Sequence, residues 1–320
     1  MSKPKIAFAG LSYCGGCDEA LLELYEYILE VADIVEISFW PTAIDIKYDY
    51  LKTLKEQELL VSFINGAVRV DEQEELARTL REKSHMVIAF GSCAHLGGIP
   101  GLANLSHKED ILEEVYKKSP AVENPEGIIP VPETESGGIT LTLPALRPWI
   151  SPLNQVIDVD YYIPGCPPQP NIIKDAVTAI VSGTLPEKGS VLAPNVSLCK
   201  TCPRAETVVG EHSLTHIKRF HEVHIDPNKC FLAQGILCFG PATRGGCGEK
   251  CIKSNMPCRG CSGPVDEVSD QGGKLISSLA SIIGSNEEKE ILKIIESIPE
   301  PAKLFNLYSL PASCLGRRNK

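Results

Sequence analysis

The sequence predicts an α/β protein with a doubly wound parallel sheet, followed by a smaller, irregular domain rich in cysteine. Residues 5–183 alternate short β-rich runs with amphipathic stretches, a pattern typical of a parallel sheet with crossover helices. After Val181 the alternation stops, and about eighty residues carry eight cysteines among glycines and prolines. We therefore expect two domains, 1–185 and 186–320.

Local patterns define the elements of the first domain. Five runs enriched in β-branched and aromatic residues are expected to be strands: 5–11, 34–40, 59–65, 86–91 and 156–163. Residues 18–31 and 71–83 are expected to be helices, because acidic residues at their starts favour a helix N-terminus. The stretch 125–152 is rich in proline and glycine, so we expect an extended surface loop there.

The second domain has little apolar periodicity between residues 199 and 261, which leaves few residues for a core. Bound metal often substitutes for burial in such a segment, since its binding energy becomes folding energy. A helical pattern returns from Gly272, in KLISSLASII and EEKEILKIIESI. We expect a segment held by metal, followed by terminal helices.

Thirteen cysteines in 320 residues require a collective explanation. The N-terminus MSKPKIAFAG has no export signal, so we expect a cytoplasmic protein, in which clustered thiols more often bind metal than form disulfides. A net charge of −10 argues against a nucleic-acid partner, because phosphate binding relies on a basic surface. No apolar run approaches ~18 residues, which excludes a membrane-spanning helix.

Four cysteines follow expected strands of the first domain. Cys14 and Cys17 form a Cys-Gly-Gly-Cys turn after the first strand, Cys93 follows the fourth, and Cys166 follows the last. The carboxyl ends of parallel strands line one crevice, so we expect these thiols to converge on a Cys₄ site. A CxxC pair alone could be a redox dithiol or half of a zinc site. The two further cysteines favour an iron–sulfur cluster over the dithiol, and zinc remains the alternative metal.

Eight further cysteines supply the number of thiols that two cubane clusters require: Cys199, Cys202, Cys230, Cys238, Cys247, Cys251, Cys258 and Cys261. Two Cys₄ zinc sites would use the same number. The acidic composition favours clusters, because no basic, aromatic face of a zinc docking module accompanies these cysteines. Cys314 is left over, and we expect it to be a free thiol.

Several motifs carry a resemblance to a known family. The segments CGGC (14–17), GSCAHLGGIPG (91–101) and PGCPP (164–168) resemble the first-cluster framework of nickel–iron hydrogenase small subunits. The segments LCKTCPRAE, CFLAQGILCFGPATRGGC and MPCRGCSGP resemble the gamma subunit of the methyl-viologen-reducing, cytosolic type, which does not reduce coenzyme F-420. The resemblance implies a flavodoxin-like first domain and three 4Fe-4S clusters.

The resemblance also implies which residues hold each cluster. The proximal cluster would take Cys14, Cys17, Cys93 and Cys166, the medial cluster Cys247, Cys251, Cys258 and Cys261, and the distal cluster Cys199, Cys202, Cys230 and Cys238. Cys199 stands where respiratory small subunits have a histidine, and a thiolate there should lower the potential. Glu19 matches a family glutamate on a proton route between subunits; the alternative is an ordinary acid in a first helical turn.

The family implies a function without a catalytic residue in this chain. Electrons from H₂ oxidation at a nickel–iron centre in the large subunit would pass through the three clusters to an acceptor iron–sulfur subunit of a heterodisulfide reductase-type flavoprotein complex. The chain alone is expected to be inactive. The alternatives are a complex I small cluster subunit, whose adjacent cysteines this sequence lacks, a coenzyme F-420-reducing hydrogenase small subunit, and a zinc-stabilised docking protein.

Overall fold

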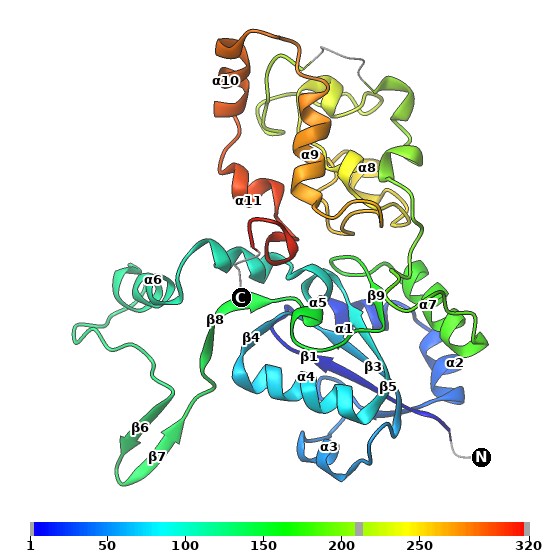
Figure 1. The fold of residues 1–320 in the computed structure, drawn as a ribbon, viewed down its shortest axis with the longest axis vertical. Coiled ribbons are helices and arrows are strands. Elements are labelled where there is room, and N and C mark those ends of the chain that lie inside the picture. The colour runs from blue at the N-terminus through cyan, green and yellow to red at the C-terminus, as the bar shows by residue number, and fades with distance from the viewer. Residues whose placement is uncertain (1–2, 209–213, 317–320) are drawn as a thin grey trace.

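A computed structural model describes residues 3–208 and 214–316. Its centre is a five-stranded sheet in which all neighbouring strands pair in parallel, in the order β2-β1-β3-β5-β9 (Figure 1). The strands are β1 (Lys5–Gly10), β2 (Glu36–Phe39), β3 (Leu59–Asn65), β5 (Ser84–Phe90) and β9 (Tyr161–Ile163). This order is that of flavodoxin-like doubly wound sheets, so the expected fold class is confirmed.

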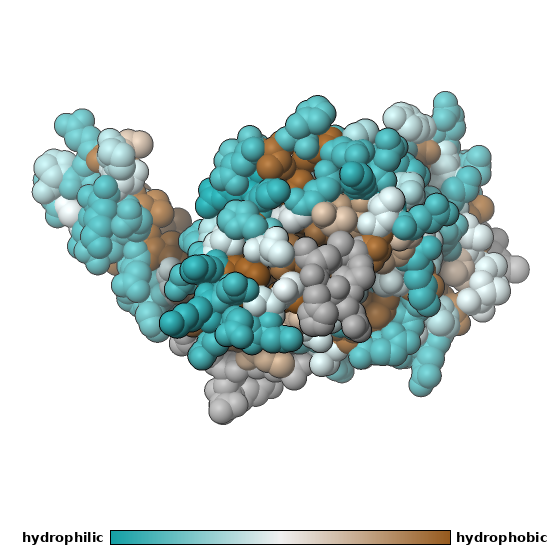
Figure 2. All heavy atoms as spheres, turned by 90° about the horizontal axis from the view of Figure 1, so that it is seen from above, coloured by the Kyte–Doolittle hydropathy of each residue, from teal (hydrophilic) through white to brown (hydrophobic). Residues whose placement is uncertain are grey.

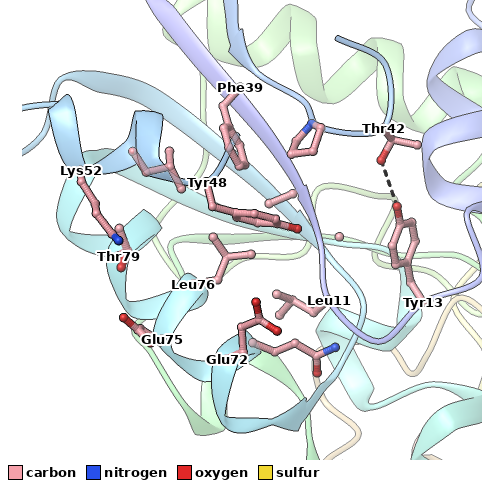
Figure 3. A pocket seen from close by; sticks show the side chains of 15 residues that line it. Leu11, Tyr13, Phe39, Thr42, Tyr48, Lys52, Glu72, Glu75, Leu76 and Thr79 are labelled. Carbon is pink, nitrogen blue, oxygen red and sulfur yellow. Dashed lines mark hydrogen bonds between the residues drawn. The ribbon is translucent and has the colours of Figure 1, made fainter. Parts of the chain in front are cut away.

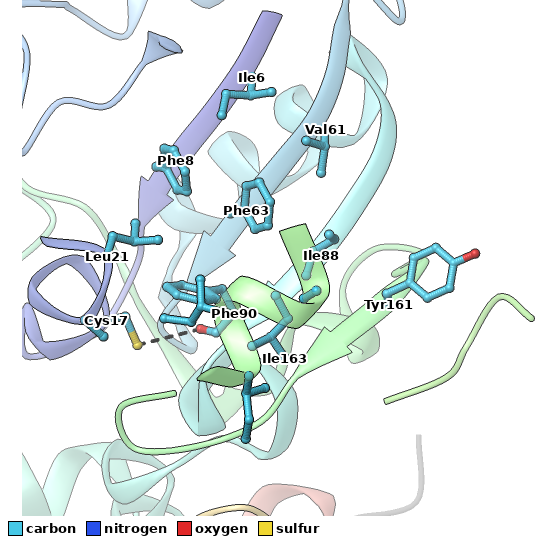
Figure 4. Packing of buried hydrophobic residues seen from close by; sticks show 14 of the residues in the cluster. Ile6, Phe8, Cys17, Leu21, Val61, Phe63, Ile88, Phe90, Tyr161 and Ile163 are labelled. Carbon is cyan, nitrogen blue, oxygen red and sulfur yellow. Dashed lines mark hydrogen bonds between the residues drawn. The ribbon is translucent and has the colours of Figure 1, made fainter. Parts of the chain in front are cut away.

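Both faces of the sheet are buried, which explains why its strands are nearly continuous apolar runs. On one face, Ile6, Phe8 and Phe63 pack under α1 (Gly16–Leu22), α2 (Tyr27–Ile34) and α7 (Pro170–Ser182), as Figure 4 shows in part. On the other face, Ala7 and Ala9 pack under α3 (Asp49–Thr53) and α4 (Asp71–Lys83). Successive side chains of β1 point to opposite faces of the sheet, because a strand has a two-residue period.

Three expectations for the first half were wrong. The strand expected at 156–163 is confined to β9, and residues 156–160 before it form no strand. The single helix expected at 18–31 is divided into α1 and α2, because the chain turns at Tyr25, whose φ is 50°. The expected loop at 125–152 contains three strands: β6 (Glu133–Ser136), β7 (Ile139–Thr142) and β8 (Leu146–Ser151). Strands β6 and β7 form a hairpin through Gly137 and Gly138, whose positive φ values suit a two-residue turn. Strand β8 pairs with β4 (Val68–Val70).

The hairpin lies on an arm that stands apart from the body of the molecule (Figures 1 and 2). Ile139, Leu141 and Leu143 on this arm are all more than half exposed. The segment that leads into the arm contains α5 (Ser92–Leu96), η1 (Ile99–Leu105), α6 (Lys108–Glu113) and η2 (Glu114–Lys118). The segment that leads into the arm therefore begins close to Cys93 in the sequence, and the arm ends at β8, which pairs with β4 in a separate two-stranded sheet.

The cysteine-rich half has an apolar core, contrary to the expectation that metal alone would hold it. Leu198, Phe231, Phe239 and Ile252 of the cysteine-rich segment are buried against Leu275 and other residues of the terminal helices. The terminal helices are α9 (Gln271–Ala280), α10 (Glu288–Glu296) and α11 (Pro301–Phe305), and the short α8 (Lys250–Lys253) lies within the cysteine-rich segment. The core residues of 198–252 lie on short turns without a regular period, so hydrophobic periodicity could not reveal them.

The two halves meet at the carboxyl edge of the sheet (Figure 1). Tyr308 accepts a hydrogen bond at its carbonyl from the Gly98 amide, at 3.0 Å. The Pro311 ring lies so close to Gly97 and Gly101 that neither position has room for a side chain. Among the described residues, no helix is both long and apolar enough to cross a membrane.

Candidate metal centres

The carboxyl edge of the sheet gathers the first set of thiols. Cys17 begins the first buried turn of α1, and its Sγ lies 3.8 Å from the carbonyl oxygen of Phe90 (Figure 4). Burial, and then the neighbouring Cys93, Cys166 and Cys14, raises the pKa of the Cys17 thiol well above its usual range. Burial together with Cys166 and Cys14 raises the pKa of Cys93 to about 12. The four predicted proximal ligands therefore lie near one another, with Cys14 exposed and Cys17 buried.

Glycine creates the space around these sulfur atoms. A Cβ at Gly91, which has φ 87°, would lie 2.6 Å from Cys17 Sγ. A Cβ at Gly98 would strike Cys93 Sγ. Larger residues would thus displace two thiols of the set. Four thiols, with space beside them left by two glycines that have no side chain, fit an iron–sulfur cluster, which thiolates bind.

The second gathered set is Cys199, Cys202, Cys230 and Cys238. All four line one small cavity beneath Leu198, Phe231 and Ile252. Burial, followed by Cys238, Cys230 and Cys202, raises the pKa of Cys199 to about 12. A Cβ at Gly240 would lie 2.9 Å from Cys199 Sγ, so a glycine also clears space here. This cavity has the same donor chemistry as the first site, and it fits a cluster for the same reasons.

The third set, Cys247, Cys251, Cys258 and Cys261, lies between the other two. Burial and the nearby Cys247 and Cys251 raise the pKa of Cys261 above its usual value. The hydrogen bond from the Cys166 amide acts in the opposite direction. Burial and then Cys238 and Cys261 raise the pKa of Cys258. Cys261 thus touches the first set through Cys166, and Cys258 neighbours the second through Cys238. The hydroxyl of Ser92 also donates to the Cys261 carbonyl oxygen.

No three or more His, Cys, Asp or Glu side chains converge closely enough to hold a single metal ion, within the parts of the chain that the structure describes. The two remaining candidate residues, Glu19 and Cys314, are both exposed. Glu19 lies on α1, and the Cys314 amide donates to Asp270 Oδ2 at 2.8 Å.

Two residues near the thiols had no place in the sequence predictions. Asp18 is buried beside Cys17, and Tyr308 is half-buried near Cys261 and Cys166. Burial and these two thiols raise the pKa of Tyr308 to about 12. In the sequence, Asp18 is marked only as an acidic residue in a first helical turn, a feature that Glu19 shares. Nothing in the sequence around Tyr308 indicates that it lies near the thiols.

A separate cavity of about 500 Å³ opens at the carboxyl ends of β1 and β2 (Figure 3). Phe39, Tyr48 and Leu76 form much of its apolar wall, and Glu72 lies at its edge. Its lining residues include no cysteine. Tyr13, which precedes Cys14 in the chain, lines this cavity, and its hydroxyl is hydrogen-bonded to that of Thr42 at 3.1 Å.

Comparisons with known proteins agree with this arrangement. Residues 14–180 match the family described as NADH ubiquinone oxidoreductase, 20 Kd subunit. One chain of the [NiFeSe] hydrogenase from Desulfovibrio vulgaris Hildenborough has a similar fold, with a TM-score of 0.53 at 17% identity over 82% of this chain and 94% of that chain. The family match defines the class as subunits of oxidoreductase complexes, and the structural match shows the shared fold.

Full-length relatives define the family more closely. The F420-non-reducing hydrogenase iron–sulfur subunit of Archaeoglobus profundus is 39% identical over 98% of both chains. The corresponding F420-non-reducing hydrogenase subunit of Methanothermobacter thermautotrophicus is 37% identical over 98% of this chain and 96% of its own. The chain belongs to the family of F420-non-reducing hydrogenase small subunits. It is an electron-transfer subunit of a hydrogenase complex, and its family carries iron–sulfur clusters.

Proposed function

We propose that this chain holds three 4Fe-4S clusters and relays electrons from H₂ oxidation in a large subunit to an acceptor subunit. The observation that carries the proposal is the row of three thiol sets, in which Cys261 adjoins Cys166 and Cys258 adjoins Cys238. The proximal, medial and distal ligands are the twelve cysteines assigned from the family resemblance. A bound cluster would supply one-electron transfer at each position.

The chain's own residues bind the clusters and exclude water. Thiolates supply all twelve ligands, and buried side chains such as Phe90, Phe231 and Leu198 surround the sulfur atoms. Amide donors to the thiolates, such as the Cys166 N–H on Cys261, stabilise the charged form of the ligand. No side chain of this chain takes part in bond making or breaking, so we expect the isolated subunit to be inactive.

The exposure of the sets suggests the direction of transfer. Cys14 is the exposed member of the proximal set, so we propose that the large subunit, with its nickel–iron centre, docks over Cys14 and the neighbouring Glu19. The acceptor, an iron–sulfur subunit of a heterodisulfide reductase-type flavoprotein complex, would dock near Cys199 and Cys230. A cytoplasmic location accords with thirteen cysteines kept as thiols and cluster ligands.

Metal analysis of the anaerobically purified hydrogenase complex tests the proposal. We expect about twelve irons per copy of this chain, with EPR signals from reduced cubane clusters. Cys14→Ser should lose iron or change one EPR signal, whereas the matched Cys314→Ser should retain the full iron content. Zinc in place of iron, or equal iron in both variants with unchanged spectra, would overturn the assignment.

A further inference from the structure

Asp18 is a buried carboxylate next to the proximal ligand Cys17. Its side chain is only 6% exposed and lies in the first turn of α1. Within the described residues it has no ion-pair partner. Burying a carboxylate without a cation is costly, so a residue of this kind needs compensating hydrogen bonds.

Three neutral donors provide that compensation. The Tyr13 hydroxyl donates to Asp18 Oδ2 at 2.8 Å, and the Trp40 indole and the Asn65 amide donate to Oδ1, each at 3.2 Å. Tyr13 follows β1, Trp40 follows β2, and Asn65 ends β3. The Asp18 carboxylate therefore ties the Cys-Gly-Gly-Cys loop to the ends of three adjacent strands.

The donors are themselves oriented toward the carboxylate. Asn65 is 1% exposed, and its Oδ1 has no hydrogen-bond partner among the residues that the structure describes, so this amide loses one interaction while it donates to Asp18. The Tyr13 hydroxyl is fixed from its other side by Thr42, at the rim of the 500 Å³ cavity (Figure 3). Three donors directed at one carboxyl group stabilise a buried anion there.

We propose that Asp18 is a positioning residue that fixes the Cys14–Cys17 loop and, as a carboxylate held by three neutral donors, lowers the reduction potential of the group bound there. This inference rests on the proposed function. A negative charge beside a redox group disfavours the added electron, as it disfavours any further negative charge nearby. The charge acts on the proximal position more than on the other two, because the carboxylate adjoins only the first thiol set.

Two variants with opposite expected signs test the role of the charge. Asp18→Asn removes the charge and should raise the potential of one couple, the same one that Cys14→Ser perturbs. A nearby charge shifts a protonation equilibrium about 10- to 1000-fold. We expect the electron-transfer equilibrium of the adjacent couple to shift in the same way, and each tenfold change corresponds to about 59 mV for a one-electron couple. Trp40→Phe removes a donor but keeps the charge, so it should lower that potential. Glu23→Gln, an exposed acid just past α1, is the matched control and should leave all couples unchanged.

EPR-monitored redox titration of the purified complex gives the measurement. Unchanged potentials in Asp18→Asn with full iron content would overturn the inference. A purely structural role would loosen the loop in both variants and shift both potentials in the same direction, which would also overturn it. If Asp18→Asn fails to assemble, a lowered potential in Trp40→Phe still supports the charge effect, and a raised or unchanged one refutes it. A wild-type complex without iron would instead refute the proposed function.

Discussion

The glycine at position 91 offers a direct test of how the first site is built. Gly91 has φ 87° and ψ 165°, a conformation that is essentially restricted to glycine and costs other residues ~1–3 kcal/mol. An alanine Cβ there would lie 2.6 Å from Cys17 Sγ, about 1 Å inside an ordinary contact of about 3.5 Å. The sulfur must then leave its rotamer, at ~1 kcal/mol more. We expect Gly91→Ala to lower the free energy of unfolding by ~3 kcal/mol and to reduce iron binding.

Gly183 supplies a matched control on the same sheet domain. It caps α7 with φ 67° and ψ 25°, and an added Cβ would meet no atom within 4 Å. Gly183→Ala should therefore cost only the left-handed strain, ~1–2 kcal/mol, with full iron content. Urea denaturation of the full chain measures the first quantity, and iron analysis of the complex measures the second. Equal unfolding free energies with equal iron in the two variants would refute the steric reasoning.

Two further predictions concern stability away from the thiols. Burial alone would raise the pKa of Asp160, but hydrogen bonds from Lys188, Arg81 and the Val87 amide lower it. The ionised carboxylate therefore stabilises the folded chain above about pH 4, and this stabilisation is lost as the pH falls through the lowered pKa. Asp160→Asn should destabilise by ~1–2 kcal/mol at neutral pH, because Lys188 is exposed and its attraction is screened by solvent, and it should flatten the acid limb of a stability–pH curve; an unchanged acid limb would contradict this. Leu275→Ala, at a fully buried position of the second core, should cost ~2–5 kcal/mol in urea denaturation, and a loss below 1 kcal/mol would indicate that metal alone holds this half.

The sheet and the strand-end cysteines were predictable because both depend on local pattern. β3 occupies the expected 59–65, and α4 occupies the expected 71–83. The hairpin on the arm was missed although Gly137 and Gly138 signal a tight turn, because the prolines around it dominated the interpretation. The break between α1 and α2 at Tyr25 had no such signal, since tyrosine is not among the residues that usually adopt a positive φ.

The surroundings of the thiols were less predictable than the thiols themselves. Asp18 and Glu19 are neighbouring acids, and which of them is buried depends on how α1 rests on the sheet. The core of the cysteine-rich half joins Phe231 and Leu275 across more than forty residues, which no local window can detect. Tyr308 reaches the thiols through the chain's path after α11, a long-range contact of the same kind.

The contact of Pro311 with Gly97 and Gly101 has a consequence for the order of assembly. Chains emerge from the ribosome N-terminus first, so the sheet can form while residues 308–311 are still unsynthesised. The segment that follows Cys93 and α5 reaches its final packing only when Tyr308 contacts Gly98 and Pro311 contacts Gly97 and Gly101. Completion of the first site is thereby coupled to synthesis of residues 308–311, and a chain that stops before them would present this site incompletely packed.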